Sequence, residues 1–154
     1  MKLSPEKSCN CTNIEPVIFH GALSESPLKC MQCKKPILLE NNNISVKFSN
    51  KINEWWKAYK SLITLTQGST EDRECAIQKL LDDIDPINLQ GLTFAQQLNT
   101  ERKTYFWMFQ DNNDKNYTQP RLCPFCGALM EPILNNDFKV CHDCMIAYPD
   151  KCTC

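Results

Sequence analysis

The longest periodic stretch of apolar positions lies in the middle of the chain and predicts a helix. Its apolar side chains recur every three or four residues, as they do along one face of a helix. They are Ile52, Trp55, Trp56, Tyr59, Leu62 and Ile63. Ser49 stands just before them and is the expected N-cap. The segment from Ile44 to Phe48 is expected to form a strand.

Two further helices are predicted after the first. The second begins at Ser69 or Thr70, where an acidic turn follows the cap. Pro86 ends this helix or begins a turn. Its apolar stripe comprises Ile77, Leu80, Leu81 and Ile84. The third helix, expected to be shorter, carries Gly91, Phe94, Ala95 and Leu98 on one face.

Strands are predicted on both sides of these helices. The continuous aromatic run from Thr104 to Phe109 indicates a buried strand, and earlier strands are expected at 17–19 and 36–39. Residues 128–133 and 138–140 should form a hairpin around a turn at 134–137, too small to fold without a metal. The predicted class is therefore α+β.

Polar joints divide the chain into three regions. Asn-rich segments at 41–43 and 111–116 have the composition of exposed loops. They separate an N-terminal zinc-knuckle segment (1–40), a mainly helical core with the aromatic strand (41–120) and a C-terminal zinc ribbon (121–154). At 154 residues, we expect one compact unit in which zinc-stabilised β modules flank the helical middle.

Ten of the eleven cysteines fall into five close pairs. Thiolates two or three residues apart can reach one metal ion from a tight turn, and two such turns complete a tetrahedral zinc site. A disulfide framework would need an oxidising compartment and a secretion signal, and residues 1–16 hold no apolar stretch of that kind. No stretch has the length of a membrane span. We therefore expect two zinc ions in a soluble cytoplasmic protein.

The C-terminal cysteines make the strongest predicted site. Fourteen residues separate its two pairs, which suits a ribbon with two knuckles, and Gly127 supplies the permissive backbone that lets amides point at sulfur. The ligands are Cys123, Cys126, Cys141 and Cys144.

A second site is predicted near the N-terminus, across an eighteen-residue loop. Its ligands are Cys9, Cys11, Cys30 and Cys33, with His20 as an alternative to one thiolate. Cys152 and Cys154 are additional candidate ligands that complete a shared site, compete for the ribbon zinc or remain as an exposed tail. Cys75 has no cysteine partner nearby and is expected to be a small buried apolar residue.

The ligand set argues against catalysis. Four thiolates close the coordination sphere, whereas a catalytic zinc keeps an open position, so we expect no enzymatic activity. The Cys123–Cys126 turn is also similar to that of glutaredoxins, but that motif should follow an early strand and open a helix. His20 and His142 stand in no catalytic arrangement. His142 is expected to face solvent or to support a zinc ligand with a hydrogen bond.

The charge of the chain bears on its partners. The formal net charge is −1, and two zinc ions held by eight thiolates would bring it to about −5. Nucleic-acid binding draws its affinity from Lys and Arg against phosphate, so a protein partner is favoured. Asp82, Asp83 and Asp85 form either a solvated turn or a docking face for a basic partner.

Aromatic side chains leave nucleic acid as the alternative partner. Trp55–Trp56 and Tyr105–Phe106–Trp107 are candidates for a platform on which bases stack. Acidic residues follow in the second helix, however, and core packing explains most of these rings better.

Several motifs occur together in this chain: Glu25–Cys33, Trp56-x-x-Tyr59, Gly91, Tyr105–Trp107, Cys123-Pro124-x-Cys126-Gly127 and Cys141-x-x-Cys144. Their combination resembles a bacterial family of zinc-ribbon proteins described as nucleic-acid-binding, whose members also occur as immunity proteins beside secreted polymorphic toxins. The chain departs from this family in its shorter N-terminal region with Cys9-x-Cys11 and in its added Cys152-x-Cys154, so a function carried by the missing part does not transfer.

The expected function follows from the closed sites, the charge and the resemblance. We expect a non-enzymatic zinc-binding protein that recognises another protein, namely an immunity protein that neutralises a toxin by covering its active site. The alternative is a nucleic-acid-binding zinc ribbon, and the third possibility is a dithiol oxidoreductase.

Overall fold

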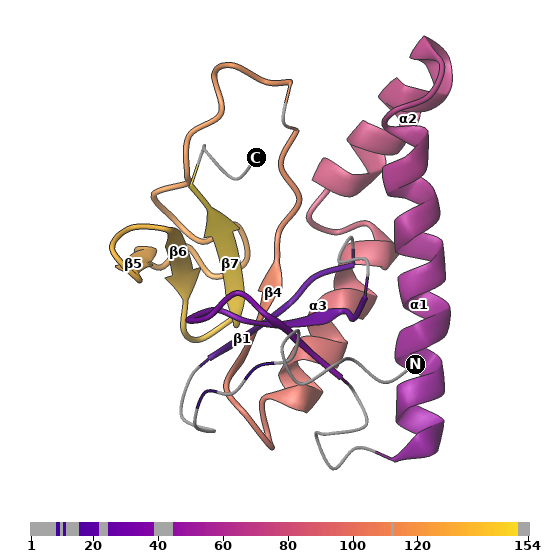
Figure 1. Cartoon of the computed structure of the whole chain (residues 1–154). Coiled ribbons are helices and arrows are strands. Elements are labelled where there is room, and N and C mark those ends of the chain that lie inside the picture. Colours follow the sequence, from indigo (N-terminus) through magenta and orange to yellow (C-terminus); the bar gives the residue numbers. More distant parts are fainter. Residues whose placement is uncertain are drawn as a thin grey trace.

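The computed structural model describes Cys9, Cys11 and residues 16–21, 25–38, 45–111 and 113–150. Within these ranges the chain forms three helices and a seven-stranded sheet (Figure 1). The helices are α1 (Val46–Leu65), α2 (Thr70–Leu81) and α3 (Pro86–Leu98). The strands are β1 (Val17–Phe19), β2 (Leu28–Cys30), β3 (Pro36–Ile37), β4 (Thr104–Trp107), β5 (Glu131–Ile133), β6 (Phe138–Cys141) and β7 (Ile146–Pro149). The predicted α+β class is confirmed.

The aromatic strand β4 joins the two cysteine-bearing halves into one sheet. The strand order is β3-β2-β1-β4-β7-β6-β5, with β4 parallel to both β1 and β7 and the other neighbours antiparallel. Phe106 pairs with Phe19 on one side and with Ile146 on the other. The predicted β modules are therefore continuous through a strand that the helical region supplies. Each edge strand contains a proline, Pro36 in β3 and Pro132 in β5, which blunts the edge against further strand pairing.

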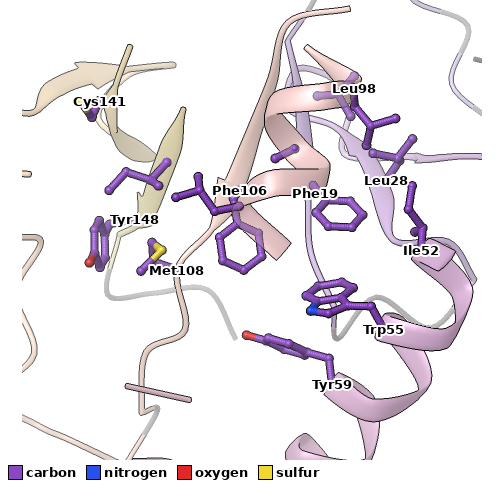
Figure 2. Close-up of a cluster of buried hydrophobic side chains, with 14 of the residues drawn as sticks. Phe19, Leu28, Ile52, Trp55, Tyr59, Leu98, Phe106, Met108, Cys141 and Tyr148 are labelled. Carbon is purple, nitrogen blue, oxygen red and sulfur yellow. The ribbon is translucent and has the colours of Figure 1, made fainter. Parts of the chain in front are cut away.

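The main core lies between one face of this sheet and the helices. Figure 2 shows Trp55 and Tyr59 of α1 beside Phe19 and Phe106 of the sheet. The Trp55 ring stacks on Phe19 at a centroid distance of 4.9 Å, and its Nε1 donates a hydrogen bond to the Ile87 carbonyl at 2.7 Å. This contact ties α1 to the start of α3 and fixes the orientation of a large buried ring.

Gly91 lets α3 approach β4 closely. A Cβ at this position would lie 2.4 Å from Phe106 Cε1 and 2.7 Å from Trp55 Cζ2. Such distances are well below van der Waals contact, so only glycine fits between the helix and these rings.

The opposite face of the sheet buries a second cluster. Alternation along the strands directs Ile18 and Tyr105 to this face, and both are 1% exposed. They share the cluster with Met31, beyond β2, and Phe138, on β6, so residues from the two halves of the sheet pack together. Figure 1 shows β1 running obliquely across the view while β6 and β7 stand upright. The strong twist of the sheet brings its two halves over this second cluster.

The start of α1 differs from the prediction. The expected strand at Ile44–Phe48 and the cap at Ser49 are wrong, because α1 already begins at Val46 and Ser45 is its N-cap; Ile44 lies outside the described residues. The Ser45 hydroxyl accepts a hydrogen bond from the Phe48 amide at 3.1 Å. This cap starts the helix across a segment that contains several strand-favouring residues.

The second and third helices also differ from the prediction, in which residues they bury and in their lengths. Residues Ala76 and Leu80 form the buried side of α2, whereas Leu81 is 48% and Ile84 71% exposed. Cys75 is exposed rather than buried. Pro86 is the first residue of α3, a favoured position for proline, so α3 has 13 residues against 12 in α2 and is not the shorter helix.

Several strands differ from their predicted bounds. Strands β2 and β7 were not expected, although β1 and the turn before β6 were predicted correctly. The aromatic strand ends at Trp107 instead of Phe109, and β5 begins at Glu131 instead of Ala128. Before β5, Leu129 pairs only with Leu122 in an isolated bridge, because the chain turns there around the first cysteine pair of the ribbon.

Candidate metal centres

Three Cys-x-x-Cys segments form turns with one common backbone pattern. In each, the residue after the second cysteine donates its amide to the carbonyl of the first cysteine at 2.9 Å. That residue also has a positive φ, which tightens the turn so that both sulfurs lie on one side. The residues are Lys34 (φ 60°), Gly127 (φ 74°) and Met145 (φ 60°).

Only one of these positions was recognisable in the sequence. Gly127 was expected to supply a permissive backbone, and the structure confirms its positive φ. Lys34 and Met145 adopt the same conformation although their side chains disfavour it. The turn hydrogen bonds impose this conformation, so the spacing of the cysteines was the only available signal.

The C-terminal turns bring four sulfurs together. The Sγ atoms of Cys123, Cys126, Cys141 and Cys144 all lie within 4.8 Å of one another, and Cys126 and Cys141 are 3.6 Å apart. Tetrahedral zinc with Zn–S bonds near 2.3 Å places its sulfurs about 3.8 Å apart. The spacing of the group therefore fits a single zinc ion.

Backbone amides already point at these sulfurs. The Phe125 amide donates to Cys123 Sγ and the Cys144 amide to Cys141 Sγ, each at 3.4 Å. A hydrogen bond from the Ala128 amide is the main reason that the pKa of the Cys126 thiol is lowered. Amide donors stabilise the thiolate form that zinc requires.

Burial acts in the opposite direction on the second pair of the ribbon. It raises the pKa of the Cys141 and Cys144 thiols, and the neighbouring cysteines raise that of Cys144 further. A divalent cation reverses this balance because it binds the deprotonated sulfurs and compensates their charge. The site is thus suited to a bound metal rather than to four free thiolates.

The N-terminal cysteines form a separate group. The Sγ atoms of Cys9, Cys11, Cys30 and Cys33 also lie within 4.8 Å of one another. The Cys11 amide donates to Cys9 Sγ at 3.3 Å, so the short Cys-x-Cys pair directs an amide at sulfur as the longer turns do. Contact with the Cys33 thiol raises the pKa of Cys11 to about 12. Two separate four-cysteine groups are therefore compatible with two zinc ions, and ligation of zinc by these residues is proposed below.

His20 does not belong to the N-terminal group. The group consists of the four cysteines, and the His20 ring packs against Trp107 with a centroid distance of 4.2 Å. Burial, and secondarily Lys29, lowers the pKa of His20 to about 3. The expectation that His20 replaces a thiolate has no support in this geometry. Cys152 and Cys154 lie outside the described residues.

His142 supports the ribbon from the exposed side of its turn. Its Nδ1 lies 2.7 Å from the Tyr105 hydroxyl, and its Nε2 lies 2.7 Å from a Glu131 carboxylate oxygen. The ring therefore links β4, in the centre of the sheet, to the edge strand β5. The expectation that His142 faces solvent is confirmed, since the residue is exposed, whereas its two ring nitrogens contact Tyr105 and Glu131 and not a ligand cysteine.

The three aspartates expected at a partner surface have different environments. Asp85 is the N-cap of α3, and its carboxylate also pairs with Lys79 at 2.9 Å. Asp82 accepts a hydrogen bond from the Ile84 amide at 3.1 Å and is exposed. Burial, and then Asp82, raises the pKa of Asp83. Asp85 thus has a structural role, whereas Asp82 and Asp83 form no ion pair within the described part of the chain.

The aromatic rings considered for base stacking lie mostly in the core. Trp55 is 4%, Tyr105 1% and Phe106 0% exposed, which confirms the interpretation as core packing. Trp56 is half-buried, and Lys60 Nζ lies 3.6 Å from the centre of its ring.

Comparison with known proteins adds no family to this picture: no protein-family model, no curated protein and no solved structure matches the chain. None of the helices in the described ranges combines the length and apolar character needed to cross a membrane.

Proposed function

We propose that the chain is a non-enzymatic zinc-binding protein that acts by binding another protein. The observation that carries this proposal is the pair of four-cysteine groups, which adjoin one shared sheet through Cys30 at the end of β2 and Cys141 at the end of β6. A zinc ion bound by four thiolates has no open position for a substrate or an activated water. Metals at these positions would instead hold short strands together.

The metals have a clear structural task in this fold. The strands that carry ligands are short, with three residues in β2 and four in β6, and such strands are marginal without further support. Zinc binding contributes on the order of 10 kcal/mol or more to the folding of small metal modules. Two zinc ions would therefore set the two halves of the sheet rigidly around β4 and present the helices on a fixed scaffold.

The proposed partner is a bacterial toxin whose active site this protein covers, as an immunity protein does. The resemblance of the cysteine motifs to a zinc-ribbon family with members beside polymorphic toxins supports this role. So does the charge, because filled zinc sites make the chain clearly acidic and an acidic inhibitor suits the basic cleft of an enzyme that acts on anionic substrates.

Co-expression tests the proposal directly. The chain would be produced with the toxin encoded beside its gene, and cell survival and co-purification would be measured. We expect survival and a 1:1 complex with wild type and with the control Cys75→Ser, which alters an exposed cysteine outside both groups. The ligand variant Cys123→Ser should lose zinc and protection together. Absence of both protection and complex with the wild-type chain would refute the immunity role.

The nucleic-acid alternative has a separate measurement. A zinc-loaded chain that binds single-stranded DNA or RNA with steep salt dependence would favour that function. Absence of binding at low salt would exclude it.

A further inference from the structure

The connection between α2 and α3 is a short, internally braced corner. The Asn88 side chain donates to the carbonyls of Leu80 and Asp82 at 2.9 and 2.8 Å. Asp82 Oδ1 accepts from the Ile84 amide at 3.1 Å, and Asp85 Oδ1 accepts from the Ile87 amide at 3.0 Å. Side chains thus satisfy the backbone groups that a loop normally exposes to water. The corner is held in one conformation before any partner binds.

This braced corner presents large apolar side chains to solvent. Ile84 is 71%, Leu81 48% and Leu89 41% exposed. Because Asp85 is the N-cap of α3, Ile84 and Leu89 occupy the N′ and N4 positions, at which apolar side chains often pack together as a hydrophobic staple. Most of Ile84 is nevertheless uncovered, so it forms an apolar projection on a rigid base. Rigid exposed anchors lose little conformational entropy on binding.

The unpaired charges beside this projection are negative. Asp82 and Asp83 directly precede Ile84 in the chain and have no cation within 4 Å among the described residues. The nearby Lys79 is already paired with Asp85 at 2.9 Å. Negative charge that remains beside an apolar anchor favours binding to a partner surface with an apolar pocket and with Lys or Arg at the rim of that pocket.

The same charges argue against a second copy as the occupant. A symmetric dimer through this corner would place Asp82 and Asp83 near their own copies, and like charges brought together at an interface are unfavourable. A partner protein of opposite charge meets no such repulsion.

We propose that the α2–α3 corner, residues Leu81–Leu89, is the docking surface of this protein, with Ile84 inserted into an apolar pocket on a partner protein and Asp82 and Asp83 facing basic residues around that pocket. This proposal rests on the proposed function, because it supposes that the chain binds a protein. It assigns the energetic centre of the interface to an apolar side chain and gives the two aspartates the role of orienting the approach.

The test measures binding of the zinc-loaded chain to a catalytically inactive form of the toxin encoded beside its gene. Ile84→Asp should raise the dissociation constant at least about tenfold, as expected for a central anchor. Ile84→Lys should raise the dissociation constant more, because a cation would face the basic residues at the rim of the partner's pocket. The matched control is Val46→Asp at the start of α1, where the native valine is 77% exposed and an acidic residue suits the first turn of a helix; its affinity should stay within twofold.

The aspartates have a distinct kinetic signature. The double variant Asp82→Asn and Asp83→Asn keeps an oxygen acceptor for the Ile84 amide, and it should slow association and flatten its dependence on salt. Circular dichroism and zinc content should remain those of wild type in every variant.

Each failure has a separate meaning. If wild type binds the toxin and Ile84→Asp binds equally well, the corner is not the docking surface while the proposed function stands. Equal losses of affinity with Ile84→Asp and Ile84→Lys would overturn the proposal that basic residues surround the partner's pocket. Self-association of the chain that Ile84→Asp abolishes would identify a second copy as the occupant and overturn this proposal. If wild type does not bind the toxin at all, the proposed function fails and the docking proposal fails with it.

Discussion

The positive φ of Lys34 permits a direct test of the zinc-knuckle geometry. A side chain in this conformation costs about 1–2 kcal/mol, and replacing it by glycine removes that cost. Glycine also gains freedom in the unfolded chain, which offsets about 0.5–1 kcal/mol of the gain. The Lys34 ion pair with Asp137 is 3.7 Å long and its two side chains are 60% and 51% exposed, so its loss subtracts only a few tenths of a kcal/mol. Lys34→Gly should therefore stabilise the zinc-bound protein by about 0.5 kcal/mol.

The converse change is available in the ribbon. Gly127 has a φ of 74°, and a Cβ at this position would have no neighbour within 4 Å. Gly127→Ala therefore introduces backbone strain without a steric clash and should destabilise the protein by about 0.5–1 kcal/mol. The two substitutions act on the same conformation with opposite sign.

Thermal unfolding at saturating zinc measures both effects. For a chain of this length, 1 kcal/mol corresponds to about 2–4 °C in Tm, so we expect Lys34→Gly to raise and Gly127→Ala to lower Tm by about 1–4 °C. Lys35→Gly is the matched control, because its backbone has no positive φ, and it should lower Tm. If Lys34→Gly lowered Tm as much as Lys35→Gly does, Lys34 would not have the left-handed conformation and the reasoning about the turns would be refuted.

Three further predictions concern metal content, packing and pH. Purified protein should contain two zinc ions by elemental analysis, and Cys141→Ser should reduce this to one while Cys75→Ser leaves two; retention of two by Cys141→Ser would contradict the ribbon site. Gly91→Ala should destabilise by about 1–3 kcal/mol despite its better helix propensity, because the added methyl group overlaps the core rings, and unchanged stability in chemical denaturation would show that α3 can move. Burial lowers the pKa of His20 to about 3, below the ordinary value of about 6.5. The contribution of neutral His20 to the free energy of unfolding is thus complete above pH 6.5 and declines as pH falls toward 3. Wild type should therefore lose more stability than His20→Gln between pH 6.5 and 5, and equal losses of stability in the two proteins would contradict the burial of His20.

The structure indicates why a small protein would use two metal groups. Strand pairing joins the two halves of the described sheet through β4, whose partners β1 and β7 are far apart in the chain. Parallel pairing between such distant segments requires closure of long loops. A zinc ion in each half would hold the local turns together on both sides of β4.

The sequence by itself determined the local features of this protein. The spacing of the cysteines predicted the close pairs that make up both four-sulfur groups, because ligands close in the chain remain close in any compact turn. The three-and-four periodicity predicted α1, and the aromatic run predicted β4 as a buried strand. These signals depend on neighbours within a few residues, so they did not require knowledge of the fold.

The tertiary structure decided the features that depend on distant residues. It placed β4 between β1 and β7, which joins the expected modules into one sheet. It exposed Cys75, because helix packing buries the side of α2 that contains Ala76 and Leu80. It also exposed Ile84, which lies beyond the end of α2 at the corner before α3. It also gave Asp85 a structural role in place of the expected partner contact, since the Asp85 carboxylate caps α3. Periodicity reports that a helix has an apolar side, but contacts across the chain determine which apolar residues are covered, and here they left Ile84 exposed at the α2–α3 corner.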